Sequence, residues 1–171
     1  MTQDLSNSPA RADILDSVRA ILPTLDAHAA EAEKRRRLPE PSVEALMSAG
    51  IHRAYVPKRF GGWEMDFALQ ADLGAILGGA CGAAAWCGLF FAQHPLVVGM
   101  MPPEAQDDVW GAGPDLLIAN AFFTPAGSCT PVEGGFLLDG DWIISSGVDH
   151  CAWNNLNVMI PQADGPPEHR F

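Results

Sequence analysis

The sequence has few positive charges, and nearly all of them lie at one end. Its 171 residues include 10 Lys and Arg against 21 Asp and Glu, a formal net charge of −11, and Arg170 is the single Lys or Arg in residues 60–171. Binding to nucleic acid depends on clustered Lys and Arg that contact phosphates, so we expect no nucleic-acid partner. Any cation that an anionic ligand needs in residues 60–169 should come from later sequence or a neighbouring subunit.

Several familiar signatures are also missing. The sequence contains no P-loop, no G-x-G-x-x-G, no G-x-S-x-G and no H-E-x-x-H motif. Asp149-His150-Cys151 has no second ligand cluster at a suitable spacing, so we predict no metal site. The four cysteines form no C-x-x-C pair, and the polar start MTQDLSNSPARAD lacks the regions of an export signal. We therefore expect reduced thiols and a cytoplasmic protein.

A long stretch without charge raises the question of a membrane span. Leu73 to Pro103 covers 31 residues with no Asp, Glu, Lys or Arg, which is long enough to cross a bilayer. The stretch is rich in Gly, contains Gln93-His94-Pro95, and has no Lys or Arg at either edge, unlike membrane helices. A helix that is apolar all round is otherwise a buried helix, and this is the interpretation we adopt.

Hydrophobic periodicity predicts an all-helical first part and strands afterwards, and thus an α+β fold. We predict a helical domain over residues 1–112 and a partial β-domain over 113–171. The first helix should be capped by Ser8 and kinked at Pro23. The predicted helices cover residues 9–37, 41–49, 67–79, 81–99 and 103–110. An ordered loop should occupy residues 51–66.

Three β-type runs follow Gly113-Pro114, at residues 115–123, 134–146 and 153–160. We expect them to pair in an antiparallel arrangement. So few strands would leave long unpaired edges. From this we infer that the chain is the front portion of a longer one, or that partner chains complete it.

Two groups of polar residues are candidates for a site. His94 lies inside an apolar helix, where it is either a hydrogen-bonded core histidine or a polar group aimed into a pocket between helices. Ser145-Ser146-Gly147 ends a predicted strand, which is either an ordinary turn or a place where a flat ligand approaches closely. His28 and His52 should lie at the surface, as should the run at 34–37.

Three segments carry a resemblance to a known family. Residues 36–66, 78–94 and 134–160 resemble the acyl-CoA dehydrogenase superfamily, and the last two resemble its hydroxylase branch, the oxygenase components of two-component flavin-dependent monooxygenases. The resemblance covers residues 9–171. It implies less than half of the family's architecture, which continues through further β-structure into a C-terminal four-helix bundle.

The resemblance implies a function and a set of site residues. Reduced flavin (FMN or FAD) from a separate reductase would form a C4a-hydroperoxide that hydroxylates an aromatic or phenolic substrate in a homotetramer. The catalytic residues implied are His94, which faces the substrate, and Ser146, which bonds flavin N5. The remaining residues implied are Trp142, Ile144, Ser145 and Phe123 at the flavin, and Trp86, Phe90 and Asn120 in the substrate pocket, with Phe91 as a further apolar wall.

Two other functions stay open. The chain could be an acyl-CoA dehydrogenase-type flavoenzyme, although residues 124–129 lack the Glu and Asp of the dehydrogenases' T-E-P-x-x-G-S-D-like run. It could instead be a non-catalytic fragment that has only packing surfaces.

Overall fold

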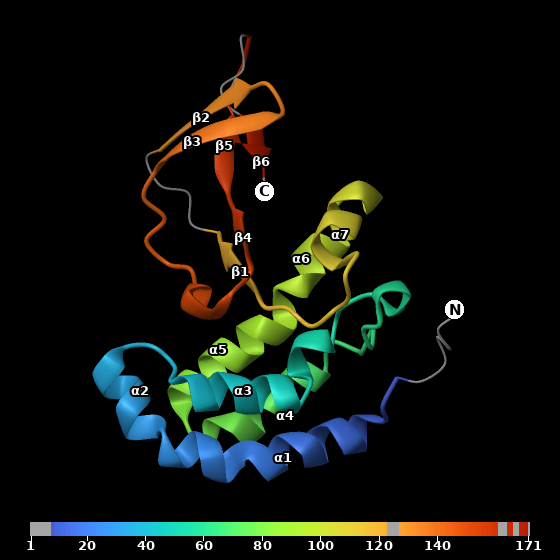
Figure 1. The fold of residues 1–171 in the computed structure, drawn as a ribbon, viewed down its shortest axis with the longest axis vertical. Helices are drawn as coiled ribbons and strands as arrows, with labels where there is room; N and C mark the ends of the chain where they lie inside the picture. Colours follow the sequence, from blue (N-terminus) through green and yellow to red (C-terminus); the bar gives the residue numbers. More distant parts are fainter. Residues whose placement is uncertain (1–7, 123–126, 161–163, 166–167, 171) are drawn as a thin grey trace.

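A computed structural model describes residues 8–122, 127–160, 164–165 and 168–170 of the chain. The fold is α+β, with most helices gathered at one end, strands at the other, and the last two helices rising beside the strands (Figure 1). The helical elements are α1 (Arg11–Ala27), α2 (Ala29–Arg35), α3 (Glu40–Ser48), η1 (Ile51–Arg53), η2 (Lys58–Phe60), α4 (Leu69–Gly78), α5 (Gly82–Gln93), α6 (Pro95–Gly99) and α7 (Pro103–Trp110). The later elements are β1 (Ile118–Ala121), β2 (Gly127–Val132), β3 (Gly135–Gly140), η3 (Val148–His150), β4 (Trp153–Leu156), β5 (Val158–Ile160) and β6 (Glu168–Arg170).

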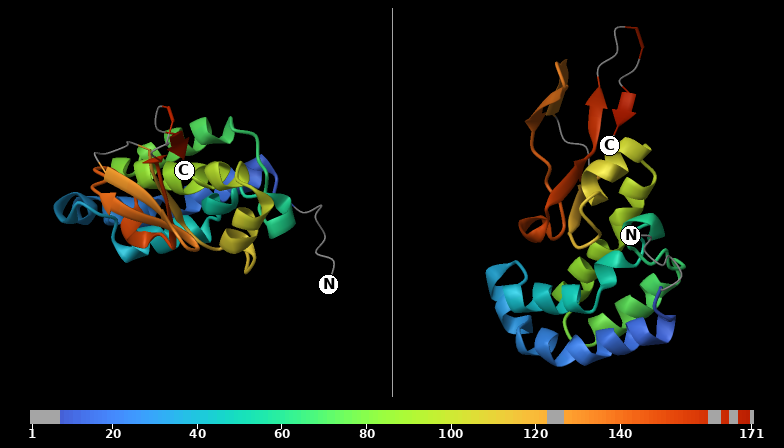
Figure 2. Two further views of the ribbon diagram at one scale, coloured as in Figure 1. Left: turned by 90° about the horizontal axis from the view of Figure 1, so that it is seen from above. Right: turned by 45° about the vertical axis from the view of Figure 1, so that its right-hand side comes forward.

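The helical half is held together by apolar residues at helical spacing. Ile14, Val18 and Leu25 are the buried residues of α1, and Leu69, Leu73 and Leu77 are those of α4. Residues four apart lie on the same face of a helix, so each helix directs one stripe into the shared core. In Figure 2, α1 lies along the outer side of this helical block. The division of the chain into two domains at residue 112 stays a prediction.

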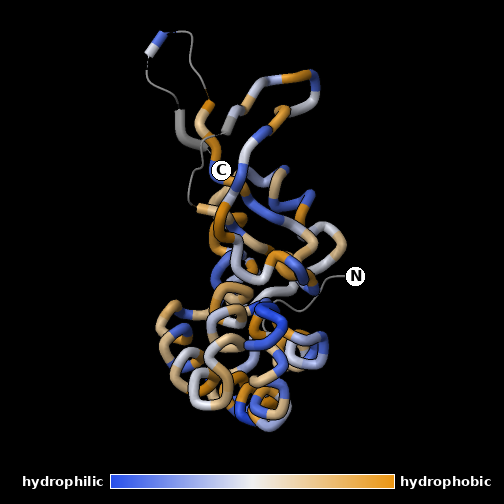
Figure 3. Tube along the Cα trace, turned by 90° about the vertical axis from the view of Figure 1, so that its left-hand side faces the viewer, coloured by the Kyte–Doolittle hydropathy of each residue, from blue (hydrophilic) through white to orange (hydrophobic). Residues whose placement is uncertain are grey.

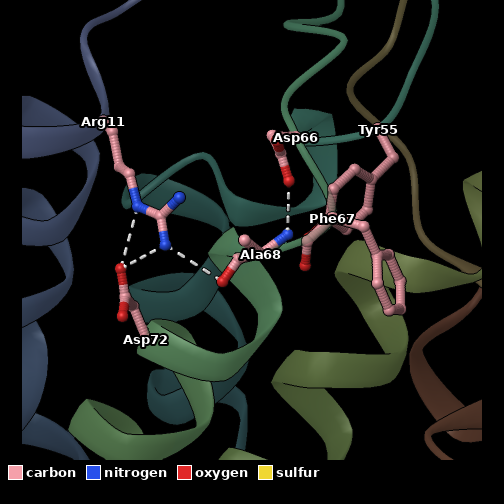
Figure 4. Close-up of polar contacts among 6 residues, drawn as sticks. All are labelled: Arg11, Tyr55, Asp66, Phe67, Ala68 and Asp72. Atoms are coloured by element: carbon pink, nitrogen blue, oxygen red, sulfur yellow. Dashed lines mark hydrogen bonds and ion pairs between the residues drawn. The ribbon is translucent and has the colours of Figure 1, made fainter.

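A polar contact joins α1 to the start of α4 (Figure 4). The Arg11 Nε and Nη2 atoms donate to Asp72 Oδ2 at 2.9 and 2.6 Å, and Nη2 also donates to the Ala68 carbonyl at 3.0 Å. Asp66 Oδ1 accepts from the N–H of Ala68, the N-cap residue of α4, at 2.7 Å and so holds the turn that precedes the helix. Both ionic side chains are partly exposed, so this contact sets the entry to α4 more than it adds stability.

The first observed helix differs from the predicted one at both of its ends, and the kink expected at Pro23 stays a prediction. It begins at Arg11 with Ala10 as the N-cap, and the predicted cap Ser8 instead donates its hydroxyl to the Trp63 carbonyl at 3.0 Å. The helix also continues past Pro23 to Ala27. The helix predicted over residues 9–37 is instead divided at His28 into α1 and α2, and the buried residues Val18 and Leu25 pack in the core on both sides of the proline.

The predicted helix over 81–99 is two helices. α5 ends at Gln93 and α6 begins at Pro95, so His94 lies in the junction between them. Proline has no N–H to continue the hydrogen-bonding pattern and suits the first position of a new helix. As expected, much of the uncharged stretch is buried. In the described residues no helix has the length and apolar character needed to cross a bilayer.

The strands pair in three ladders, and one of them corrects the prediction. β2–β3 and β5–β6 are antiparallel, but β1 and β4 are parallel, with Ile118 opposite Trp153 and Ala121 opposite Leu156. A parallel pair requires a long crossover, and residues 122–152 supply it. β2 was not predicted as a strand. The predicted strand over 134–146 ends at Gly140, so Trp142 to Ser145 are extended chain outside any ladder.

Apolar side chains lie at the surface of the strand-bearing half. They include Phe136, Leu137, Ile143 and Trp153. In Figure 3 hydrophobic colouring likewise continues from the helical block into the strands and their connections. Each ladder in the described residues has two strands, too few to bury both faces of a sheet.

Candidate functional site

An aromatic row runs along one face of α5 and ends at β1. Trp86, Phe90 and His94 follow at intervals of four residues, and their ring centroids are 5.1 and 4.9 Å apart. Phe122, just after β1, extends the row at 6.3 Å from the His94 ring. The helical repeat places these residues on one face. Trp86, Phe90 and His94, which were predicted to share the substrate pocket, are therefore brought together.

His94 is buried, with 2% of its surface exposed, and its protonation state follows from its contacts. Nδ1 lies 2.8 Å from the Ile118 carbonyl oxygen of β1. Because a carbonyl can only accept, Nδ1 carries the hydrogen and Nε2 keeps a lone pair in the neutral ring. Burial lowers the pKa of His94 from its usual 6.5, and the bond to Ile118 opposes this in part. The structure thus agrees with the first interpretation, a hydrogen-bonded buried histidine, and places its ring in the aromatic row. That His94 faces a pocket between helices stays a prediction.

Ser146 meets the other end of the row. The Trp86 Nε1–H donates to Ser146 Oγ at 2.9 Å, which leaves the serine hydroxyl its own hydrogen and a second lone pair. Ser145 Oγ instead donates to Asn154 Oδ1 at 3.0 Å. Gly147 has φ +75°, and a Cβ there would lie 2.4 Å from Phe91 Cε1. The glycine therefore lets the chain after Ser146 approach α5 closely.

The other residues predicted to contact the flavin differ in how far they are buried. Trp142 is half-buried and donates its Nε1–H to the Asn157 carbonyl at 3.0 Å. Ile144 is 52% exposed. Phe123 lies outside the described residues. Since residues 141–145 form no strand, the predicted strand end around Ser146 is instead a turn leading into η3.

Asn120 lies in β1, between Ile118 and Phe122, the two residues of this segment that contact the His94 ring. Its side chain is buried, and its Oδ1 accepts from Asn155 Nδ2 on β4 at 2.6 Å. Its Nδ2 is buried without a hydrogen-bond partner among the described residues. A buried donor without a partner is uncommon in proteins and calls for an explanation such as a ligand or water.

The predicted apolar pocket is an open face in these residues. Trp86 is 59% exposed and Phe122 is 40% exposed. Phe91, predicted as a wall, is instead packed in the helical core beside Gly147, because it lies one position away from Phe90 and so on another face of α5. The described residues form one wall of a site and do not enclose it.

Sequence reasoning missed the cations that lie beside Ser145 and Ser146. A cavity of about 280 Å³ lies between the turn after α2 and the segment leading into η3. Its lining is Arg36, Arg37, Leu38, Cys87 and residues 143–150. Folding thus brings the end of the basic run, which lies earlier in the sequence, against residues more than a hundred positions later, whereas the expectation named only later sequence or another subunit as the source of cations. No local signal in the sequence relates the two.

His52 also departs from its predicted surface position. It is buried, and its Nε2 lies 3.0 Å from Asp115 Oδ1, while Arg53 Nε donates to the same oxygen at 2.6 Å. Burial lowers the pKa of His52 despite the neighbouring carboxylate, and the Arg53 hydrogen bond lowers the pKa of Asp115. The cluster fastens the chain that leads into β1, and so helps to position Ile118 against His94.

A metal centre has no support in the described part of the chain, where no group of three or more His, Cys, Asp and Glu residues is placed to hold an ion. The chemistry available at this site is that of aromatic faces, a neutral imidazole, a hydroxyl and an amide. Such a combination suits a flat organic ligand with polar edges.

No family model matches the chain. Individual proteins and solved structures are nevertheless similar to it over most of its length. The oxygenase component of p-hydroxyphenylacetate 3-hydroxylase from Acinetobacter baumannii is 34% identical over 158 residues, which are 92% of this chain and 37% of that protein. The crystal structure of 3-HSA hydroxylase from Rhodococcus sp. RHA1 has a TM-score of 0.83 at 31% identity, over 92% of this chain and 40% of that one.

A further structure contains a ligand. XiaF from Streptomyces sp., in complex with FADH2 and glycerol, has a TM-score of 0.84 at 28% identity, over 92% of this chain and 40% of XiaF. The chain thus spans about two fifths of the length of the relatives that it matches. Over that length, it is a homologue of the oxygenase components of flavin-dependent monooxygenases and shares their acyl-CoA dehydrogenase-like fold.

Proposed function

We propose that this chain provides one wall of the active site of a flavin-dependent monooxygenase, the oxygenase component of a two-component system, which hydroxylates an aromatic or phenolic substrate. The observation that carries the proposal is the aromatic row of α5, with neutral His94 in it and the Ser146 hydroxyl at its Trp86 end. The similarity to the oxygenase component of p-hydroxyphenylacetate 3-hydroxylase and the FADH2 bound in XiaF support it. A separate flavin reductase is the partner that this proposal requires.

The residues present fit a reduced flavin, FAD or FMN. When bound, reduced flavin supplies the activation of dioxygen, which no protein side chain provides. A flat ring suits the exposed aromatic side chain of Trp86 and the half-buried Phe90 beside it. Ser146 retains a donor and an acceptor for the polar edge of such a ring, and the unpaired Asn120 Nδ2 offers a further donor nearby in the fold.

His94 acts on the substrate in this proposal. Its Nδ1–H is held by the Ile118 carbonyl, which orients the ring and leaves the Nε2 lone pair to accept a phenolic proton. Because burial lowers the pKa of His94, the imidazole is neutral at neutral pH and its Nε2 lone pair is not protonated. Removing that proton raises electron density on the aromatic ring that is to be hydroxylated.

Ser146 positions the flavin. The Trp86 indole holds the hydroxyl oxygen in place, and Gly147 keeps this turn against α5. Trp142, tied to the Asn157 carbonyl, fixes the extended segment on which Ser145 and Ser146 are carried. We further propose assembly as a homotetramer in the cytoplasm, which would cover the exposed apolar residues of the strand-bearing half.

Titration of the 171-residue chain with reduced FAD and FMN under anaerobic conditions, followed by tryptophan fluorescence, tests the proposal. We expect binding, and we expect Ser146→Ala to weaken it by roughly 2- to 10-fold, the value of one neutral hydrogen bond. Ser48→Ala, which removes a hydroxyl bonded only within α3, is the matched control. Binding of a phenol to the flavin complex should be weakened by His94→Asn.

Two results would contradict the proposal. One is a folded chain that binds neither flavin. The other is flavin binding with equal affinity in the wild type, Ser146→Ala and Ser48→Ala, which would leave the serine without a role and favour the non-catalytic interpretation.

A further inference from the structure

The cavity between α2 and η3, which we call the basic cavity, has an excess of positive charge. Arg36 and Arg37 line it, against the single carboxylate of Asp149. Burial raises the pKa of the Cys87 thiol to about 11, so this lining residue adds no negative charge at neutral pH. Arg37 is partly engaged, since its Nη2 donates to Glu40 Oε1 at 3.2 Å. Arg36 forms no ion pair or hydrogen bond through its side chain with any described residue.

The backbone of Arg36 is unusual for its residue type. Arg36 caps the end of α2 at φ 56° and ψ 29°, in the left-handed region. Glycine or asparagine is favoured at such a helix end, because a side chain with a Cβ is strained there. Among the described residues Arg36 and Glu64 are the non-glycine residues with positive φ. Strain of this kind clusters at functional sites, and here it occurs at a residue that lines the cavity and whose guanidinium is uncommitted.

The basic cavity shares Ser146 with the candidate site. This residue lines the cavity and also accepts the hydrogen bond from Trp86 at the end of the aromatic row. His150, on the same lining, has a buried Nε2 with no hydrogen-bond partner in the described residues. A ligand that extends from the row into the cavity would thus pass from aromatic faces to a hydroxyl and then to cations.

We propose that the basic cavity is an oxyanion-binding site in which Arg36 and Arg37 hold the phosphate group of a flavin nucleotide. The assignment of the phosphate to a flavin rests on the proposed function, whereas the oxyanion site itself rests on the cavity alone. Guanidinium groups bind phosphate through paired, charge-assisted hydrogen bonds. Asp149 opposes the anion, which leaves the affinity dependent on both arginines.

The test compares FMN with riboflavin, which lacks the phosphate, and uses inorganic phosphate as a separate probe. We expect the 171-residue chain to bind FMN about tenfold or more tightly than riboflavin, because charge-assisted hydrogen bonds contribute on that scale. Arg36→Gly should abolish this preference and leave riboflavin binding unchanged. The same substitution relieves the left-handed backbone, so its melting temperature should equal or exceed that of the wild type.

Lys34→Gln is the matched control, because Lys34 belongs to the same basic run but does not line the cavity. It should leave the preference for FMN intact. Arg36→Asn, which tolerates the left-handed conformation and removes the charge, provides a second variant and should behave like Arg36→Gly.

The outcomes separate the two proposals. Inorganic phosphate binding that Arg36→Gly abolishes, in a chain that binds no flavin, would support the oxyanion site and contradict the proposed function. Equal binding of FMN and riboflavin without any binding of phosphate would overturn the oxyanion site and leave the proposed function standing. A preference for FMN that Lys34→Gln reduces as much as Arg36→Gly does would also overturn it, since the effect would then be one of net charge.

Discussion

Replacing Gly147 by alanine should destabilise the segment that carries Ser146, for two separable reasons. Gly147 has φ +75°, a conformation that costs an alanine about 1 kcal/mol. The new Cβ would also lie 2.4 Å from Phe91 Cε1 and 2.7 Å from Phe91 Cζ. Phe91 is among the most buried side chains, so its ring has little room to move. Overpacking of a core in this way costs about 1–3 kcal/mol. We therefore expect a total loss of about 2–4 kcal/mol.

Gly134→Ala serves as the matched control. Gly134 has φ +80°, but no atom lies within 4 Å of the position of its Cβ. This variant should therefore lose only the backbone part, about 1 kcal/mol. The difference in the free energy of unfolding between the two variants measures the cost of the contact with Phe91.

Urea unfolding followed by circular dichroism and tryptophan fluorescence measures these free energies. In a double-mutant cycle, Phe91→Leu should recover at least about 1 kcal/mol of the loss caused by Gly147→Ala, because it removes the ring atoms that the Cβ would meet. Equal losses for Gly147→Ala and Gly134→Ala, with no coupling to position 91, would refute the reasoning and show that the turn moves freely away from α5.

Two further predictions concern stability. Pro23→Ala should raise the free energy of unfolding by up to about 3 kcal/mol in urea, since Pro23 lies inside α1 without an N–H to donate; unchanged or lower stability would mean that the proline ring makes contacts that compensate. For pH, burial lowers the pKa of both His52 and His94, so the unfolded chain binds more protons. The stability that these neutral rings contribute is present above pH 6.5 and is lost as the pH falls from 6.5 through the folded-state pKa values. Urea unfolding between pH 8 and 5.5 should show this loss, and His52→Gln should reduce it; the lowered pKa of Asp115 acts only at more acidic pH.

The sequence pattern predicted the structure correctly where the spacing of residues along a single helix decides how they are arranged. The row of Trp86, Phe90 and His94 follows from the helical repeat alone, and the helix over residues 103–110 was predicted with its observed ends. The sequence pattern did not predict that β1 and β4 pair in parallel. Their apolar runs have the composition of strands, but nothing in either run tells whether its partner will be parallel, because direction depends on the path of the crossover between them.

The positions of the charged residues show most directly what the sequence decides and what only the tertiary structure decides. The sequence by itself determined that residues 60–169 contain no Lys or Arg, that His94 follows Trp86 and Phe90 at intervals of four residues, and that strands follow helices. Only the tertiary structure decided that Arg36 and Arg37 lie across a cavity from Ser145 and Ser146. It also decided that His52 is buried against Asp115. The physical reason is that helical and strand periodicity act between neighbours in the chain, whereas the burial of apolar faces brings together segments whose separation in sequence carries no signal.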